Sequence, residues 1–71
     1  MARDVEIRDG TIRLGQLLKL ADLIDAGSDA KALIAEGLVQ VNGAVELRRG
    51  RQLSAGDVVR VGDDEVRVTT P

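Results

Sequence analysis

The spacing of apolar residues changes near the middle of the chain. Between residues 14 and 34 apolar side chains recur every three or four positions, whereas after Leu38 they alternate with polar ones. The first spacing predicts helices and the second predicts strands that are buried on one face. Two helices followed by a run of short strands indicate an α+β fold. We expect a helix-turn-helix unit packed on a small antiparallel sheet.

The first expected helix begins near Thr11, whose hydroxyl suits an N-cap. Gly15 lies inside this helix, where it should cost about 1 kcal/mol relative to Ala, and the pattern gives no reason for it. Gln16 and Lys19 fall outside the apolar stripe. That stripe, widened by Leu20 and Leu23, consists of Leu14, Leu17, Leu18, Ala21 and Ile24.

Residues 25–28, Asp-Ala-Gly-Ser, interrupt the helical pattern and predict a short turn. The second helix is expected to run from Gly27 or Ser28 to Glu36. Asp25 or Ser28 would cap it. Because this turn is too short to separate two domains, the two helices should pack together.

The segment after the second helix combines a helix stop, a strand and a tight turn. Gly37 occupies the position where a helix ends in a left-handed residue. Asn42-Gly43 is a strong signal for a two-residue hairpin, because both residues tolerate positive φ. Ala44–Leu47 should therefore return antiparallel to Leu38–Val41.

Further strands are expected at both ends of the chain. Val5 and Ile7 alternate with charged residues and give a weak strand signal before Asp9-Gly10. Near the other end, Val59–Val61 and Val66–Val68 should form the arms of a hairpin. Leu53 lies between these patterns as a lone apolar residue.

The composition excludes most catalytic chemistry. The 71 residues, expected to be a single domain over 1–71, contain no Cys, no His and no aromatic residue. Without Cys or His, nucleophile–base pairs and the commonest metal ligands are missing. Asp63-Asp64-Glu65 is interpreted as a solvated hairpin tip. We therefore expect no enzyme activity, no metal and no cofactor, in a monomeric cytoplasmic protein that has no signal peptide or membrane span.

The distribution of charge suggests a binding surface. The net charge is −2, yet residues 31–60 hold five basic and three acidic side chains. Three of the basic ones form the run Arg48-Arg49-Gly50-Arg51, where guanidinium groups suit bidentate contacts with phosphate. Lys19 and Lys31 lie off the apolar stripes of the two helices, so they can share a face with this run. An ordinary solvated loop is the alternative interpretation.

The absence of aromatic residues constrains how nucleic acid would be bound. Proteins that bind single strands usually stack bases on aromatic rings, and this chain has none. Binding would instead depend on phosphates and shape, as in a structured RNA helix or hairpin.

Three segments carry a resemblance to a known family. They are Leu17-Leu18-Lys19, then Ala30-Lys31-x-x-Ile34-x-Glu36-Gly37-x-Val39-x-Val41-Asn42-Gly43, then Gly56-Asp57-x-Val59-x-Val61. Together they resemble the RNA-binding domain named after ribosomal protein S-four of the small subunit, whose helical unit is known as the αL motif. The resemblance covers about residues 13–61, and the Glu46-x-Arg48-Arg49 segment is typical of short, stand-alone bacterial members.

This resemblance implies a non-catalytic protein that binds structured RNA of the ribosomal or transfer RNA kind, with the ribosome or a ribosomal subunit as a possible partner. By position, the RNA-binding surface would use Lys19, Lys31, Arg48, Arg49 and Arg51. Many members have Ser-Arg where this chain has Ala26-Gly27. Two other hypotheses are a protein-interaction module whose basic loop docks an acidic partner, and a ubiquitin-like sulfur carrier. Such carriers end in Gly-Gly, and because Pro71 cannot play that part we do not expect this chain to be one.

Overall fold

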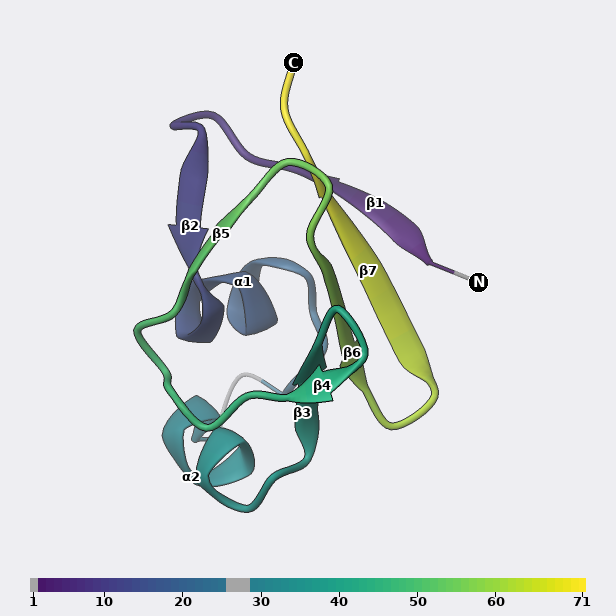
Figure 1. Cartoon of the computed structure of the whole chain (residues 1–71). Helices are drawn as coiled ribbons and strands as arrows, with labels where there is room; N and C mark the ends of the chain where they lie inside the picture. Colours follow the sequence, from purple (N-terminus) through teal and green to yellow (C-terminus); the bar gives the residue numbers. More distant parts are fainter. Residues whose placement is uncertain (1, 26–28) are drawn as a thin grey trace.

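The computed structural model describes residues 2–25 and 29–71. The described residues form two helices and seven strands, which confirms the α+β class (Figure 1). In chain order the elements are β1 (Arg3–Glu6), β2 (Thr11–Arg13), α1 (Leu14–Leu20), α2 (Ala30–Ala35), β3 (Val39–Val41), β4 (Ala44–Val45), β5 (Gln52–Ser54), β6 (Val58–Val61) and β7 (Asp64–Thr69).

The main sheet has five strands in the order β1-β7-β6-β3-β4. The predicted hairpins are present, because β3 pairs antiparallel with β4 and β6 with β7. The expectation of a purely antiparallel sheet was wrong, since β1 runs parallel to β7. Two parallel strands need a long connection, and here all the elements between β1 and β7 form that connection. A second ladder pairs β2 antiparallel with β5, so Leu53 lies in a strand opposite Ile12.

Helix α1 begins later than the sequence predicted. Thr11 is not its N-cap, because Thr11 pairs with Ser54 in the β2–β5 ladder. The first free amide groups of the helix are instead satisfied by backbone carbonyls of a distant loop. The N–H of Leu14 donates to the carbonyl of Arg51 at 2.9 Å, and the N–H of Gly15 donates to that of Arg49 at 3.1 Å. Because these capping carbonyls lie far along the chain, the residues around the start of α1 do not reveal where the helix begins.

Helix α1 also ends earlier than predicted, at Leu20 rather than near Ile24. Asp22 adopts a φ of +60°, and the N–H of Leu23 donates to the carbonyl of Leu18 at 3.0 Å. This arrangement is a Schellman motif, which stops a helix at a left-handed residue. Leu20 then faces solvent, with 57% of its surface exposed, although the sequence pattern placed it on the apolar stripe.

Helix α2 begins at Ala30 and is capped by Asp29, whose side chain accepts a hydrogen bond of 3.0 Å from the N–H of Lys31. The predicted caps were Asp25 and Ser28, and Ser28 lies outside the described residues, as do Ala26 and Gly27. The turn of the expected helix-turn-helix unit runs through these residues, so this detail stays a prediction.

The end of α2 matches the prediction at Gly37, which adopts a φ of +76°. Its N–H donates to the carbonyl of Ile34 at 3.0 Å, and that of Leu38 donates to Leu33 at 3.3 Å, which is again a Schellman motif. Glycine is favoured here because other residues resist positive φ.

The turn at Asn42-Gly43 also matches, with φ values of +53° and +86°. The Asn42 side chain adds a role that the sequence did not reveal. Its Oδ1 accepts a hydrogen bond of 2.9 Å from the N–H of Val58, and its Nδ2 donates to Asp57 at 3.0 Å. The β3–β4 turn is thereby joined to the start of β6.

One core lies between the helices and the sheets. In Figure 1, α1 lies between the β2–β5 ladder and the five-stranded sheet. The apolar stripe of α1 is buried as predicted, with Leu14, Leu17 and Leu18 fully covered. Its partners in the core include Leu53 and sheet valines such as Val59, Val66 and Val68. Packing therefore holds α1 and the ladder in fixed positions relative to the sheet.

Candidate functional site

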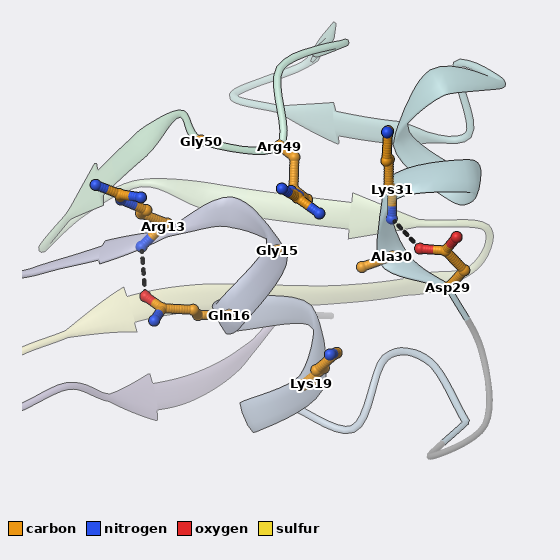
Figure 2. A pocket seen from close by; sticks show the side chains of 9 residues that line it. All are labelled: Arg13, Gly15, Gln16, Lys19, Asp29, Ala30, Lys31, Arg49 and Gly50. Carbon is orange, nitrogen blue, oxygen red and sulfur yellow. Dashed lines mark hydrogen bonds between the residues drawn. The ribbon is translucent and has the colours of Figure 1, made fainter.

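An open depression of about 360 Å³ lies where α1, α2 and the loop after β4 meet (Figure 2). We call it the basic pocket. The described residues that line it include four basic side chains and a single acidic one, Asp29. The lining consists of Arg13, Gly15, Gln16, Lys19, Asp29, Ala30, Lys31, Arg49 and Gly50.

Three of the five predicted site residues line the basic pocket. Lys19 lies in the last turn of α1, Lys31 in the first turn of α2 and Arg49 in the basic loop, which we define as residues 48–51. All three side chains are exposed. Figure 2 shows Arg49 extending from the loop toward the space between α1 and α2. Separate segments of the chain therefore bring these cations together.

Two further polar residues of the pocket, Arg13 and Gln16, were missed as site residues. Arg13 lies at the end of β2, and its backbone N–H donates to Oε1 of Gln16 at a long 3.4 Å. Arg13, Gln16 and Lys19 are spaced three apart, so they follow one side of α1 away from the buried leucines. That spacing was the available signal.

The other two predicted site residues, Arg48 and Arg51, do not line the pocket. Both side chains bind the carboxylate of Glu46, which is 8% exposed. Nη1 of Arg51 lies 2.8 Å from Oε1 of Glu46, and Nε of Arg48 lies 3.4 Å from Oε2. The Arg48 side chain nevertheless keeps 76% of its surface exposed, against 35% for Arg51. Arg48 is therefore far more accessible to a ligand.

Glu46 holds the start of the basic loop by several hydrogen bonds at once. Its Oε2 also accepts bonds from the backbone N–H groups of Leu47 and Arg48, at 3.0 and 3.2 Å. The hydrogen bond from Arg51, together with those from Arg48, lowers the pKa of Glu46 to about 2. The carboxylate is thus ionised at neutral pH, which partly compensates the charge of the two arginines.

Gly15 explains how Arg49 reaches the pocket. A Cβ atom added to Gly15 would lie 2.8 Å from Cγ and 3.4 Å from Cδ of Arg49. The aliphatic part of the Arg49 side chain therefore lies directly against the backbone of α1. The hydrophobic pattern offers no reason for a glycine at this helical position, whereas the contact with Arg49 does.

The basic pocket suits an anion with several oxygen atoms. Arginine and lysine supply only donors and positive charge, and arginine adds bidentate geometry. Within residues 2–25 and 29–71, no group of three or more Asp, Glu, His or Cys side chains is arranged to hold a metal ion. In the same part of the chain, neither helix has the length and apolar character needed to cross a membrane.

A second depression, of about 450 Å³, has a different character. It lies beside β1, β2 and α1, and its lining carries both signs of charge, with Glu6 and Asp9 close to Arg8. Mixed charge gives no preference for an anion. The basic pocket is therefore the stronger candidate for a binding site.

Comparison with known proteins finds one matching family and similar bacterial proteins, each over most of the chain. The family model of the S4 domain matches residues 5–69. A Bacillus subtilis protein named "Probable ribosome maturation protein RlbA" is 48% identical over 61 residues, which cover 86% of each chain. An Escherichia coli protein named "Putative RNA-binding protein YbcJ" is 42% identical over 57 residues, covering 80% of this chain and 81% of that one.

Proposed function

The chain belongs to the S4 domain family, and from this premise we propose that it is a non-catalytic protein that binds structured RNA. The names of its relatives refer to RNA binding and to ribosome maturation. We propose ribosomal RNA, or an RNA of similar compact structure, as the ligand, and the cytoplasm as the place of action.

The observation that carries this proposal is the gathering of Arg13, Lys19, Lys31 and Arg49 around one depression. A pocket with four cations and one carboxylate attracts phosphates even though the whole chain has a net charge of −2. We propose that these four side chains contact the phosphate backbone of the RNA.

Arg48 and Arg51 belong to the edge of the proposed surface. Arg48 is exposed enough to reach a phosphate, whereas Arg51 is half-buried and already bound to Glu46. We therefore expect Arg51 to contribute less to affinity than the pocket residues. Its main effect would be to keep the basic loop in place.

Salt dependence and charge removal test the proposal. With a fluorescein-labelled RNA hairpin as the probe, four phosphate contacts predict a slope of log affinity against log salt of about −2.8 to −3.6. The double variant K19A/K31A should lower affinity and reduce this slope by about 1.4 to 1.8. All of the substituted side chains are exposed, so folding should be preserved.

The double variant R60A/R67A is the matched control. Like K19A/K31A it removes two exposed positive charges, but from strands β6 and β7, away from the pocket lining. Equal losses in the two double variants would mean that only net charge matters, which would contradict the assigned surface. Salt-insensitive binding by the unmodified protein would contradict phosphate recognition altogether.

A second candidate function is a protein-interaction module that docks an acidic partner on the same basic loop. The observation that favours it is the exposure of Leu47, 62%, directly before Arg48. Pull-down from lysate with and without nuclease separates the two candidates. Partners that survive nuclease treatment would favour protein docking, and partners lost with the RNA would favour RNA binding.

A further inference from the structure

The backbone of α1 at Gly15 lies directly against Arg49 of the basic loop. The position that a Cβ would occupy lies 2.8 Å from Cγ of Arg49 and 3.8 Å from its carbonyl oxygen. A separation under 3.0 Å is too short for two carbon atoms that are not bonded. Any larger residue at position 15 must therefore displace the Arg49 side chain, or the loop that carries it.

The loop itself is held in place by the helix. The N–H of Gly15 donates to the carbonyl of Arg49 at 3.1 Å, and the N–H of Leu14 donates to that of Arg51 at 2.9 Å. Among residues 2–25 and 29–71, the partners of these two amide groups are the carbonyls of Arg51 and Arg49, so moving the loop would break both hydrogen bonds. The side chain, rather than the backbone, should respond to a substitution.

The response of the side chain follows from its geometry. Cγ is the second side-chain atom of Arg49, so only a change of χ1 moves it away from α1. Such a rotation carries the whole guanidinium to another direction. In the structure this group extends into the basic pocket with Lys31 on the facing side (Figure 2). Displacement at Cγ would therefore remove one cation from the pocket.

We propose that Gly15 is a positioning residue for RNA binding, which acts by leaving room for the Arg49 side chain to lie across α1 and enter the basic pocket. This inference rests on the proposed function. It also explains why a glycine occurs at a helical position where alanine would favour the helix. The contribution of Gly15 to binding is thus made entirely through Arg49.

A double-mutant cycle tests this coupling. The variants are G15A, R49A and G15A/R49A, with R67A as a control for loss of one exposed arginine charge. Affinity for the fluorescein-labelled RNA hairpin and its salt slope are measured for each. R49A should weaken binding roughly three- to ten-fold and reduce the slope by about 0.7 to 0.9. G15A should weaken binding and reduce the salt slope by similar amounts, although it removes no charge.

The double variant gives the decisive comparison. Without the Arg49 side chain the clash disappears, so adding G15A to R49A should cause no further loss of affinity. In that background the thermal midpoint should rise, because alanine favours the helix. When Arg49 is present, G15A should raise the thermal midpoint by less, or should lower it. A residue with a merely structural role would alter the midpoint in both backgrounds alike and would leave the salt slope unchanged.

Each other outcome has a definite meaning. If R49A weakens binding and G15A does not, the positioning role is overturned while RNA binding stands. If G15A is equally harmful with and without Arg49, it does not act through Arg49. If the unmodified protein does not bind the hairpin in a salt-dependent way, the proposed function fails and this inference with it. A crystal structure of G15A adds a test without RNA, because an unchanged χ1 of Arg49 would also overturn the inference.

Discussion

Oε1 of Glu46 accepts a hydrogen bond of 2.8 Å from Nη1 of Arg51, and this contact ties the last residue of the basic loop to Glu46, which lies two residues before the loop begins. Oε2 of the same carboxylate binds the backbone N–H groups of Leu47 and Arg48. One nearly buried acid thus fixes both ends of the loop. Replacing Arg48, Arg49 and Arg51 together would also remove both side-chain partners of Glu46, so such a triple variant tests folding as well as binding.

Replacing Glu46 should loosen the basic loop. In E46Q the side chain keeps its size but loses its charge, and one of its oxygens becomes an NH₂ donor that faces other donors. We expect the thermal midpoint to fall by several degrees. A midpoint equal to that of the unmodified protein, measured by circular dichroism, would show that Glu46 adds nothing to stability. The comparison variant E36Q changes an exposed glutamate at the end of α2 and should have little effect.

The pH dependence of stability follows from the same carboxylate. The pKa of Glu46 is lowered from 4.5 to about 2, chiefly by Arg51, so its ionised form favours the folded state. This contribution is fully present above pH 4.5 and is lost as the pH falls toward 2. The gap in unfolding free energy between the unmodified protein and E46Q should therefore narrow over that range. Urea titrations at several pH values measure the gap.

The unfolding free energy of E46Q must be subtracted from that of the unmodified protein at each pH, because the pKa of a second carboxylate, Asp57, is also lowered in the folded state. The side chain of Asn42 and the N–H of Ser54 hold the pKa of Asp57 below its usual range. Its contribution has the same sign and is also lost in acid. A gap that stayed constant down to pH 2 would contradict the assignment to Glu46.

Asn42 should contribute to stability in two ways. Its side chain makes two hydrogen bonds, and asparagine adopts the left-handed backbone conformation of this turn more readily than alanine does. N42G removes two side-chain hydrogen bonds but suits the φ of +53°, so we expect a loss of about 1–2 kcal/mol. N42A removes the same bonds and adds left-handed strain, which should cost about 1 kcal/mol more. Denaturant unfolding measures both values. If N42A were the more stable variant, the turn geometry would be wrong.

Leu53 should be essential to the core although it is isolated in the sequence. Its side chain is fully buried, so L53A should cost about 2–5 kcal/mol. This is a large part of the stability of a 71-residue domain. L47A is the matched control, because Leu47 is 62% exposed and its truncation should change stability by less than about 0.5 kcal/mol. Similar losses in both variants would contradict the β2–β5 packing.

Local signals predicted the helix stop at Gly37, the hairpin at Asn42-Gly43 and the buried face of α1, because each depends on neighbouring residues. Contacts between distant segments were harder to predict. The pairing of β1 with β7 and of β2 with β5 joins segments far apart in the chain. No periodicity within one segment can reveal its partner.

The candidate site was predicted in part for the same reason. Basic residues off the apolar stripes identified Lys19 and Lys31, and the arginine run identified Arg49. The sequence could not tell Arg49 from its neighbours, since the distinction depends on Glu46 and on the space beside Gly15. Whether these side chains contact RNA stays a prediction.

The parallel pairing of β1 and β7 has a mechanical consequence. Arg3 lies opposite Val66 and Glu6 lies opposite Thr69, so the two strands point the same way. A force that draws Arg3 and Thr69 apart therefore slides one strand along the other. All the hydrogen bonds between them are loaded together, instead of opening one after another from an end. The fold should thus resist stretching along this axis better than its small core suggests.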